Sequence, residues 1–359
     1  MLLLSLANAG IVSEVGEPVQ FELAGTFARL FPKDDGNWLV ALGAGKGMKF
    51  QTVNGDLQAQ DQFKDVITGT AFVDTSITPC GDGGWLVAGS GNVESHNDSL
   101  WVYRLDANGF ILGNSTVVDR QSDANTNDMV VICTPTITGV GWAENFAHID
   151  GTGQVVEIQS ISEYLMGGGM TVWDGRIYLT SAGPQSNFLS LSIYDADFSN
   201  RETVDLQVDM GGARAYWPQR MIRLDQDTWV VVSMGKQDGQ IQADEGNVFL
   251  HFYDTDWELL ESTQISQYPG PVGCMRPWVS RRDDTLMVSW DSEIRPWGVP
   301  VTIGGVGTVD TSDPSDTDGD SGPGGTDGGG PGCGGCASGG GVGGAGLALL
   351  LSLLLRRKS

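Results

Sequence analysis

Two short sequence units alternate along most of this chain, and this repetition limits the folds that are open to it. The first unit is a run of four to six mostly apolar residues that follows a turn. Runs of this length are typical of strands and too short for helices. The clear copies are 36–41, 84–88, 175–179, 228–232 and 285–289, and a weaker copy is 129–132. The chain therefore predicts a series of buried inner strands.

The second unit is an alternating strand that ends in Asn or Asp at a tight turn, and it follows every copy of the first unit but the last. A further strand often comes after the turn. Asn-Gly and Asp-x-x-Gly turns between alternating strands are typical of hairpins. The turn residues, which are 52, 44, 45 and 59 positions apart, are Asn54, Asp106, Asp150, Asp195 and Asp254.

A β-meander that repeats with this period is typical of a β-propeller, whose blades hold four strands each. Five full repeats and a partial sixth at 277–302 predict six blades. Five or seven blades are alternatives because the third repeat is degenerate, and a pair of β-sandwiches is the alternative fold. We expect the segment around 19–23 to supply the missing outer strand of the last blade. The resemblance is to propeller repeats in general, and the sialidase Asp box, Ser-x-Asp-x-Gly-x-x-Trp, is absent from the turns.

The charge balance excludes one class of partner. The chain has 359 residues with 45 acidic and 20 basic side chains, which gives a net charge of −25. Nucleic acid binding needs clustered Lys and Arg to neutralise phosphates. No nucleic acid partner is therefore expected.

The five cysteines are unevenly placed. Cys80, Cys133 and Cys274 lie in the repeats, and Cys333 and Cys336 lie near the end. Cys80 and Cys133 can form a disulfide in an oxidising compartment, and buried free thiols are the alternative. Sequence alone does not fix the pairing.

The C-terminal region has three parts. We assign 303–332 as a disordered linker because it contains almost only Gly, Asp, Ser, Thr and Pro from residue 304 onward. Cys333 and Cys336 follow. The chain is then free of charge over 337–355, and a basic cluster at 356–358 follows, one residue before the end. Nineteen uncharged residues predict a hydrophobic helix that can span a bilayer, with its basic end in the cytoplasm.

A Cys motif, a hydrophobic helix and an Arg cluster in this order resemble the MYXO-CTERM sorting signal of myxobacteria and their relatives. The run of Gly at 339–341 also resembles the related GlyGly-CTERM signal. The resemblance covers 333–359. It implies that a membrane protease removes the helix and that Cys333 or Cys336 becomes the attached residue. The chain is then an exported protein held at the cell envelope or cell surface by its C-terminus, and an uncleaved membrane anchor is the alternative.

The N-terminal residues 1–9 have features of a signal peptide remnant. They end in Ala7-Asn8-Ala9, which has the form of a signal peptidase site. The apolar part before this site is short and no Lys or Arg precedes it, so we expect the true start codon upstream. A frayed or strand-forming terminus is the alternative. The predicted organisation is this remnant, a propeller domain at 17–302, the linker and the sorting signal.

Neither catalytic residues nor a metal site nor a cofactor is predicted. The sequence has no nucleophile elbow and no phosphate loop. His148 and His251 lie in apolar strands, where structural roles are expected. His96 lies in a polar loop, where a metal or acid/base role is the alternative. The acidic segment 316–320 lacks the Gly and Glu that an EF-hand calcium loop needs.

Arginine and tryptophan gather just before two of the predicted inner strands, at 211–220 and 273–278. In a propeller such segments lie at the mouth of the central channel, where they would bind an anion or stack on a sugar. The alternative is that the Trp rings pack between blades and the Arg residues pair with acids. The candidate ligand-binding residues are Arg214, Trp217, Arg220, Arg276 and Trp278.

These observations favour a non-catalytic binding or adhesion protein that displays a propeller at the cell surface, with a glycan or a protein as its ligand. The alternative is a surface hydrolase or lyase that acts on polysaccharide in the channel. That activity would need two or more carboxylates near Arg214 and Arg276. A third hypothesis is a structural envelope protein without a small ligand. The fold alone does not choose among them.

Overall fold

A computed structural model describes most of the repeat region, namely residues 10–44, 47–68, 72–93, 96–118, 129–161, 165, 168–182, 188–211, 214–236, 246–266, 275–292 and 295–304. The chain divides into two compact units, 1–319 and 320–359. All the described residues belong to the first unit. The predicted signal remnant, the sorting signal with Cys333 and Cys336, and the linker after residue 304 lie outside them.

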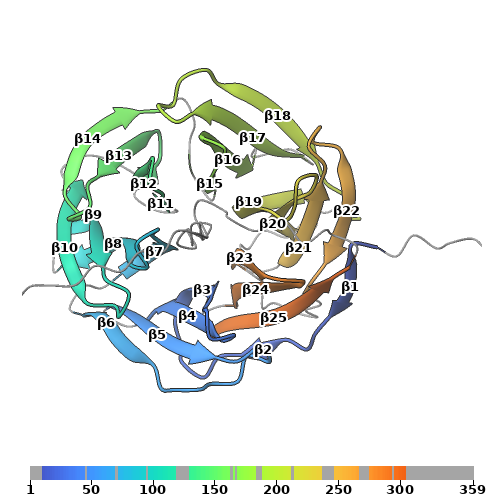
Figure 1. The fold of residues 1–359 in the computed structure, drawn as a ribbon, viewed down its shortest axis with the longest axis horizontal. Coiled ribbons are helices and arrows are strands. Elements are labelled where there is room, and N and C mark those ends of the chain that lie inside the picture. Colours follow the sequence, from blue (N-terminus) through green and yellow to red (C-terminus); the bar gives the residue numbers. More distant parts are fainter. Residues whose placement is uncertain are drawn as a thin grey trace, which may run out of the picture. The chain divides into compact units, whose positions relative to one another are not determined.

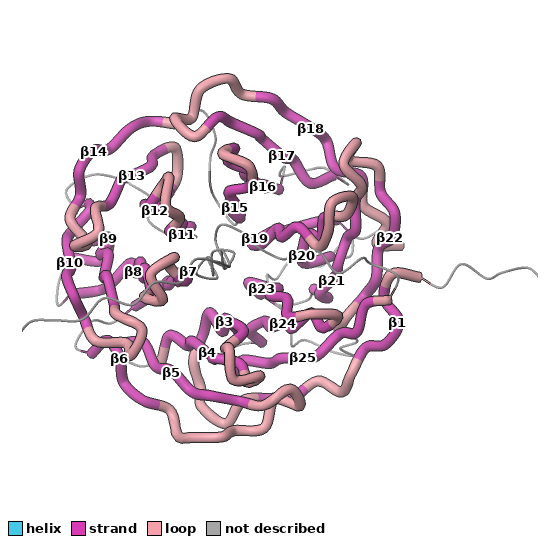
Figure 2. Tube along the Cα trace, viewed as in Figure 1, coloured by secondary structure: helices cyan, strands magenta, loops and turns pink. Residues whose placement is uncertain are grey.

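The described part is all-β (Figures 1 and 2). The strands in chain order are β1 (Val12–Val15), β2 (Val19–Gln20), β3 (Thr26–Pro32), β4 (Trp38–Gly43), β5 (Gly47–Val53), β6 (Lys64–Thr68), β7 (Phe72–Pro79), β8 (Trp85–Val93), β9 (His96–Leu105), β10 (Ile111–Val118), β11 (Val130–Cys133), β12 (Thr138–Trp142), β13 (Asn145–Ile149), β14 (Val155–Ser160), β15 (Gly169–Trp173), β16 (Arg176–Ala182), β17 (Phe188–Asp195), β18 (Glu202–Gln207), β19 (Arg214–Arg223), β20 (Trp229–Lys236), β21 (Gly246–Tyr253), β22 (Leu259–Gln264), β23 (Met275–Arg282), β24 (Thr285–Ser292) and β25 (Arg295–Ile303).

The strands form six antiparallel sheets around one axis, so the chain is a six-bladed β-propeller (Figure 1). Blade 1 is β3–β6, blade 2 is β7–β10, blade 3 is β11–β14, blade 4 is β15–β18 and blade 5 is β19–β22. Blade 6 combines β23–β25 with β1 and β2. The first strand of each blade lies nearest the axis. The predicted fold and blade number are confirmed.

The N-terminal segment closes the ring by joining the last blade. Val12 and Val15 of β1 pair with Ile303 and Val301 of β25, and β2 pairs with the same strand through Val19 and Gln20. The predicted closure by the N-terminal segment is therefore found. The structure differs from the prediction in two details: the strand expected at 19–23 ends at Gln20, and β1 lies before the predicted domain start at residue 17. The free edge of β25 selects these partners, because an unpaired edge leaves backbone groups unsatisfied.

The predicted Asn and Asp turns join the third and fourth strands of the blades. Asp106 Oδ1 accepts hydrogen bonds from the N–H groups of Asn108, at 2.9 Å, and Phe110, at 2.8 Å. This side-chain acceptor fixes the turn, which explains why a short polar residue stands at this position. The same pair of bonds is formed by Asn54, Asp150 and Asp254.

The structure corrects the assignment of the inner strands. Five of the apolar runs lie in second strands, β4, β8, β16, β20 and β24, and only the weak copy at 129–132 lies in a first strand, β11. The second strand of a blade is covered on both faces and needs a nearly continuous apolar sequence. The first strand turns part of its surface to the channel and tolerates polar residues. The Arg-rich segments before the apolar runs are thus the innermost strands themselves.

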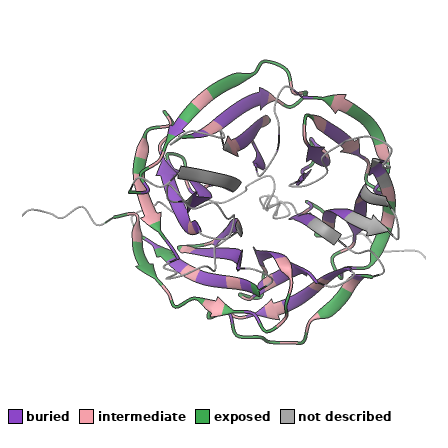
Figure 3. Cartoon of the chain, turned by 180° about the vertical axis from the view of Figure 1, so that it is seen from behind, coloured by how far each residue is buried: buried purple, intermediate pink, exposed green. Residues whose placement is uncertain are grey.

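The core consists of apolar side chains that pack between neighbouring blades, and burial decreases from the inner strands to the rim (Figure 3). The largest cluster joins blades 5 and 6 through residues that include Val230, Val232, Leu250, Leu286 and Val288. Cys80 and Cys133 are both buried and form a disulfide that ties blade 2 to blade 3. The structure therefore contains the predicted disulfide and not a pair of free thiols. Cys274 lies outside the described residues.

Within the described ranges there is no helix with the length and apolar character needed to cross a membrane. The predicted hydrophobic helix at 337–355 lies beyond them.

Candidate functional site: the axial cavity

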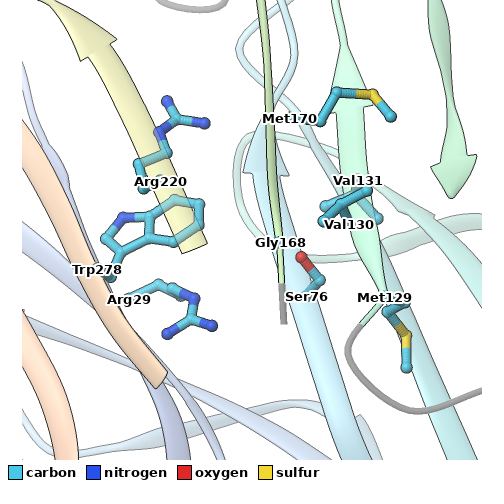
Figure 4. Close-up of a pocket in the computed structure, with 9 residues that line it drawn as sticks. All are labelled: Arg29, Ser76, Met129, Val130, Val131, Gly168, Met170, Arg220 and Trp278. Carbon is cyan, nitrogen blue, oxygen red and sulfur yellow. The ribbon is translucent and has the colours of Figure 1, made fainter. Parts of the chain in front are cut away.

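A cavity lies on the propeller axis and is lined by all six blades (Figure 4). Its empty space is about 290 Å³, including open solvent. Each lining residue comes from a first strand or from a position next to one. The lining residues are Arg29, Ser76, Met129, Val130, Val131, Gly168, Met170, Arg220 and Trp278. We refer to this space as the axial cavity.

The wall of the axial cavity has two chemically different parts. Blades 5, 6 and 1 contribute Arg220, Trp278 and Arg29, which we term the cationic arc. Blades 3 and 4 contribute apolar side chains that we term the apolar arc, namely Met129, Val130, Val131 and Met170. Figure 4 shows the two arcs facing each other across the cavity. A ligand in the cavity would contact both.

Trp278 is held between two guanidinium groups, one from each neighbouring blade. The Cζ atoms of Arg29 and Arg220 each lie 4.7 Å from the centre of its ring. Its Nε1–H donates to Ser280 Oγ at 3.0 Å, and Phe31 contacts the ring in an edge arrangement with centroids 5.8 Å apart. A desolvated cation over an indole contributes about 2 kcal/mol. Trp278 therefore organises both arginines and presents no free face for stacking a sugar.

Arg220 is a buried cation that has no counter-charge among the described residues. Its side chain lines the cavity and the residue is only 6% exposed. Among the described residues no carboxylate lies within ion-pair distance of it, and its Nε has no hydrogen-bond partner. Removing an unpaired charge from water is costly. Arg220 lies at the cavity wall, so a ligand in the cavity can supply the missing negative charge.

Arg29 is anchored by the backbone. Its Nη1 donates to the carbonyl oxygens of Ala28, at 3.3 Å, and Arg276, at 3.1 Å. The second bond joins blade 1 to blade 6. Arg29 is thus a positioned charge beside the cavity.

A buried carboxylate supports the cationic arc from behind. Asp291 of β24 is fully buried and accepts hydrogen bonds from Phe27 N–H at 2.6 Å and Ala28 N–H at 3.3 Å. Phe27 has φ of 59° and Arg276 has φ of 52°, which non-glycine residues rarely adopt. The Arg276 Cζ lies 4.2 Å from the centre of the Phe27 ring. Asp291 thus holds an unusual backbone where blade 6 meets blade 1.

The ionisation of Asp291 is shifted by its surroundings. Burial raises the pKa of its carboxyl from 3.8 to about 6, although the Phe27 N–H bond and the charges of Arg276 and Arg29 act in the opposite direction. Desolvation therefore outweighs the two arginines.

The sequence-predicted residues are only partly brought together. Arg220 and Trp278 line the cavity. Arg276 is not among the lining residues, and its guanidinium lies over the Phe27 ring. Arg214 and Trp217 belong to β19, but their side chains are outside the described part of the chain. Trp278 also packs between blades, as the structural alternative expected.

Sequence reasoning missed Arg29 and Asp291. Arg29 stands just before the first apolar run, as Arg220 stands before the fifth-blade run. Treating the segment before every apolar run as an inner strand would have found it. Asp291 carries no such signal, because its role depends on contact with β3, which is more than 250 positions away.

His251 serves the packing of blade 5. It is fully buried and its two ring nitrogens lie 2.8 Å from the hydroxyls of Ser233 and Ser262. Burial lowers its pKa to about 3, so the ring is neutral at ordinary pH. Over the described ranges no group of three or more His, Cys, Asp or Glu is placed to hold a metal ion.

No protein-family model matches the chain, and a search of curated proteins finds no match. Several solved structures are similar at low identity. A subtype N10 neuraminidase-like protein of A/little yellow-shouldered bat/Guatemala/060/2010 is 11% identical with a TM-score of 0.47, over 82% of this chain and 99% of that one. The Pan2 WD40 domain of Neurospora crassa is 13% identical with a TM-score of 0.45, over 77% and 89%. A sialidase of Trypanosoma rangeli is 11% identical with a TM-score of 0.47, over 78% and 55%. Likenesses at this level carry no argument about activity.

Proposed function

We propose that this chain is a non-catalytic binding protein whose propeller takes an anionic ligand in the axial cavity. The observation that carries the proposal is Arg220, a buried cation that lines the cavity and has no carboxylate partner in the described structure. A carboxylate or phosphate oxygen on Arg220 would supply the missing charge-assisted hydrogen bonds.

The carboxylates near the arginines favour binding over hydrolysis. General acid/base cleavage of a polysaccharide needs two carboxyl groups that flank the bond. In the described residues, Asp291 is the carboxylate beside Arg276 and Arg29, and both its oxygens accept backbone N–H groups. It does not line the cavity. A polysaccharide hydrolase or lyase is therefore the second candidate.

Titration calorimetry of the full chain with acetate, inorganic phosphate and glucuronate tests the proposal. We expect at least one anion to bind, and Arg220→Met to weaken that binding roughly 10- to 100-fold, because a hydrogen bond to a charged group contributes about 1.5–3 kcal/mol. Arg220→Lys should retain part of the affinity.

Arg223→Met is the matched control, because Arg223 lies on the same strand β19 and also stacks on tryptophan, with its Cζ 4.8 Å from the Trp173 ring, but does not line the cavity. It should leave anion binding unchanged. Failure of all three anions to bind, or equal loss in the Arg223 variant, would refute the proposal.

We further propose that the propeller is displayed at the cell surface through Cys333 or Cys336 after proteolytic removal of the hydrophobic segment. The Cys80–Cys133 disulfide supports an oxidising compartment. Mass spectrometry of the mature protein from its native host should find the basic cluster at 356–358 removed. A mature chain that still carries this cluster would contradict the processing.

A further inference from the structure

The axial cavity has room for a very small occupant. The space open to the centre of a water-sized molecule is about 20 Å³, which is enough for one such molecule. A carboxylate or a phosphate reaches Arg220 by placing one oxygen in this space and leaving the rest of the molecule outside it. A monoatomic anion, by contrast, enters completely.

Two buried cations face this space. Arg29 and Arg220 are 3% and 6% exposed, and both line the cavity. The Cζ atom of each lies 4.7 Å from the centre of the Trp278 ring. In the described part of the chain, Arg220 has no carboxylate within ion-pair distance, and its Nε has no hydrogen-bond partner. A water molecule would leave this charge unneutralised, whereas an anion would neutralise it.

The rest of the wall suits a weakly hydrated anion. Ser76 contributes a hydroxyl that can donate a hydrogen bond, and the apolar arc contributes no donor side chain. An ion that holds its water tightly, such as fluoride, loses more in this setting than chloride or bromide does. A guanidinium is itself more weakly hydrated than an ammonium, which suits it to a pair with little water.

The rest of the molecule provides a low background for anion binding. The chain carries 45 acidic and 20 basic side chains, and its net charge is −25. A field of this sign repels anions from the surface. An anion that binds this chain therefore needs a local positive site such as the cationic arc.

We infer that the axial cavity binds a single halide ion, chloride under ordinary conditions, with Arg220 as a hydrogen-bond donor and Arg29 as the second positive charge. This inference rests on the proposed anion-binding function and specifies its ligand. Arg220 comes from blade 5 and Arg29 from blade 1, and both lie over Trp278 of blade 6. The ion thus joins the blades where the ring closes, and it stabilises the closed ring.

The first test is thermal unfolding of the full chain in sodium chloride, bromide, fluoride and sulfate at equal ionic strength. Chloride in tenfold excess over its dissociation constant should raise the transition midpoint by about 3 °C. Bromide should act similarly, and fluoride and sulfate should do less. Sulfate stabilises proteins in general because it is excluded from their surface, so the expected order is opposite to the general salt effect.

The second test detects chloride directly, through the broadening of its NMR line by the full chain. We expect broadening that added bromide reverses. Arg220→Met should reduce the broadening at least tenfold and remove the chloride-specific stabilisation, because it removes a charged donor. Arg223→Met removes the same charge outside the cavity and should change neither. The salt order and the broadening in the unmodified protein stand by themselves if the Arg220 variant fails to fold.

The possible failures are distinguishable. If acetate, phosphate or glucuronate bind through Arg220 but neither chloride nor bromide does, the halide ligand is wrong and the anion-binding function stands. If no anion of either set binds, both proposals are wrong. If sulfate stabilises the protein more than chloride, or the two arginine variants respond to chloride alike, the ions act outside the cavity and the inference is overturned.

Discussion

The cationic and apolar arcs place different kinds of side chain at the same position of the first strand. Counting back three residues from the last residue of the first strand gives Arg29 in blade 1, Arg220 in blade 5, Val130 in blade 3 and Met170 in blade 4. All four line the axial cavity. In these four blades the position in the first strand therefore fixes where the side chain points, and the identity of the residue decides which chemistry is placed there.

The two arcs also differ in backbone. The first strands of the cationic arc, β3, β19 and β23, have 7, 10 and 8 residues, and each contains a shift of register. Those of the apolar arc, β11 and β15, have 4 and 5 residues and pair without a shift. Bulges re-aim side chains and are common beside functional sites. The irregular arc is thus the one that carries the buried charges.

Buried ionisable groups follow the same division. In the described structure the buried charged residues and His belong to blades 1, 2, 5 and 6, and none belongs to blade 3 or 4. They are Arg29, Arg104, Arg220, His251, Arg281 and Asp291. Most of these groups lie in blades 1, 5 and 6, which carry the cationic arc. The stability of these blades therefore depends on buried charge, and that of blades 3 and 4 does not.

The largest expected effect is the loss of stability in acid through His251 of blade 5. Its folded-state pKa of about 3 lies below the ordinary 6.5, so the unfolded chain binds more protons between these values. Stability is full above pH 6.5 and falls by about 5 kcal/mol as the pH drops to 3. Denaturant unfolding from pH 7 to 3 should show this slope, and His251→Gln should reduce it. An unchanged slope in the variant would assign the loss to other groups.

The disulfide tests the apolar side, where Cys133 ends the inner strand of blade 3. The bridge closes a loop over a sequence separation of 53 residues, and loop entropy predicts about 4 kcal/mol of stabilisation. The double variant Cys80→Ser, Cys133→Ser should lose that amount in denaturant unfolding at pH 7. Reduction of the unmodified protein should reproduce the loss. Equal stability with and without reductant would show that the disulfide does not stabilise the folded protein.

Asp291 predicts the opposite pH dependence to His251. Its folded-state pKa of about 6 lies above 3.8, so the folded chain binds more protons between these values. Its contribution is most favourable below pH 3.8 and worsens by about 3 kcal/mol as the pH rises to 6. The difference in unfolding free energy between the unmodified protein and Asp291→Asn should change by this amount between pH 4 and 7. A constant difference would show that Asp291 keeps one protonation state.

The smallest effect concerns Arg220 without ligand. A buried charge that serves ligand binding and not packing should lower stability. Arg220→Met should therefore raise the free energy of unfolding by about 1 kcal/mol, even though the variant loses the contact with Trp278. Met170→Ala on the apolar arc, where the side chain serves packing, should lower it by about 2 kcal/mol or more. Destabilisation of the Arg220 variant would assign that side chain a structural role.

Local sequence patterns predicted much of the fold. The apolar runs marked the second strands because strands covered on both faces need continuous apolar residues. Asn54, Asp106, Asp150 and Asp254 marked the turns because their side chains bond the backbone two and four residues onward. Arg220 and Trp278 were found because Arg and Trp gather before an apolar run. Arg29 was overlooked because its segment holds one arginine among apolar residues.

The sequence by itself determined the repeat and the turn chemistry, since each depends on residues within a few positions of one another, and it predicted six blades without excluding five or seven. Only the tertiary structure decided which strand of each blade faces the axis, that β1 joins β2 on the edge of β25, and that Cys80 bonds Cys133. It also decided that Arg220 of blade 5 and Arg29 of blade 1 hold the same indole of blade 6. Closing the ring brings together residues about 250 positions apart, and no local pattern encodes such contacts.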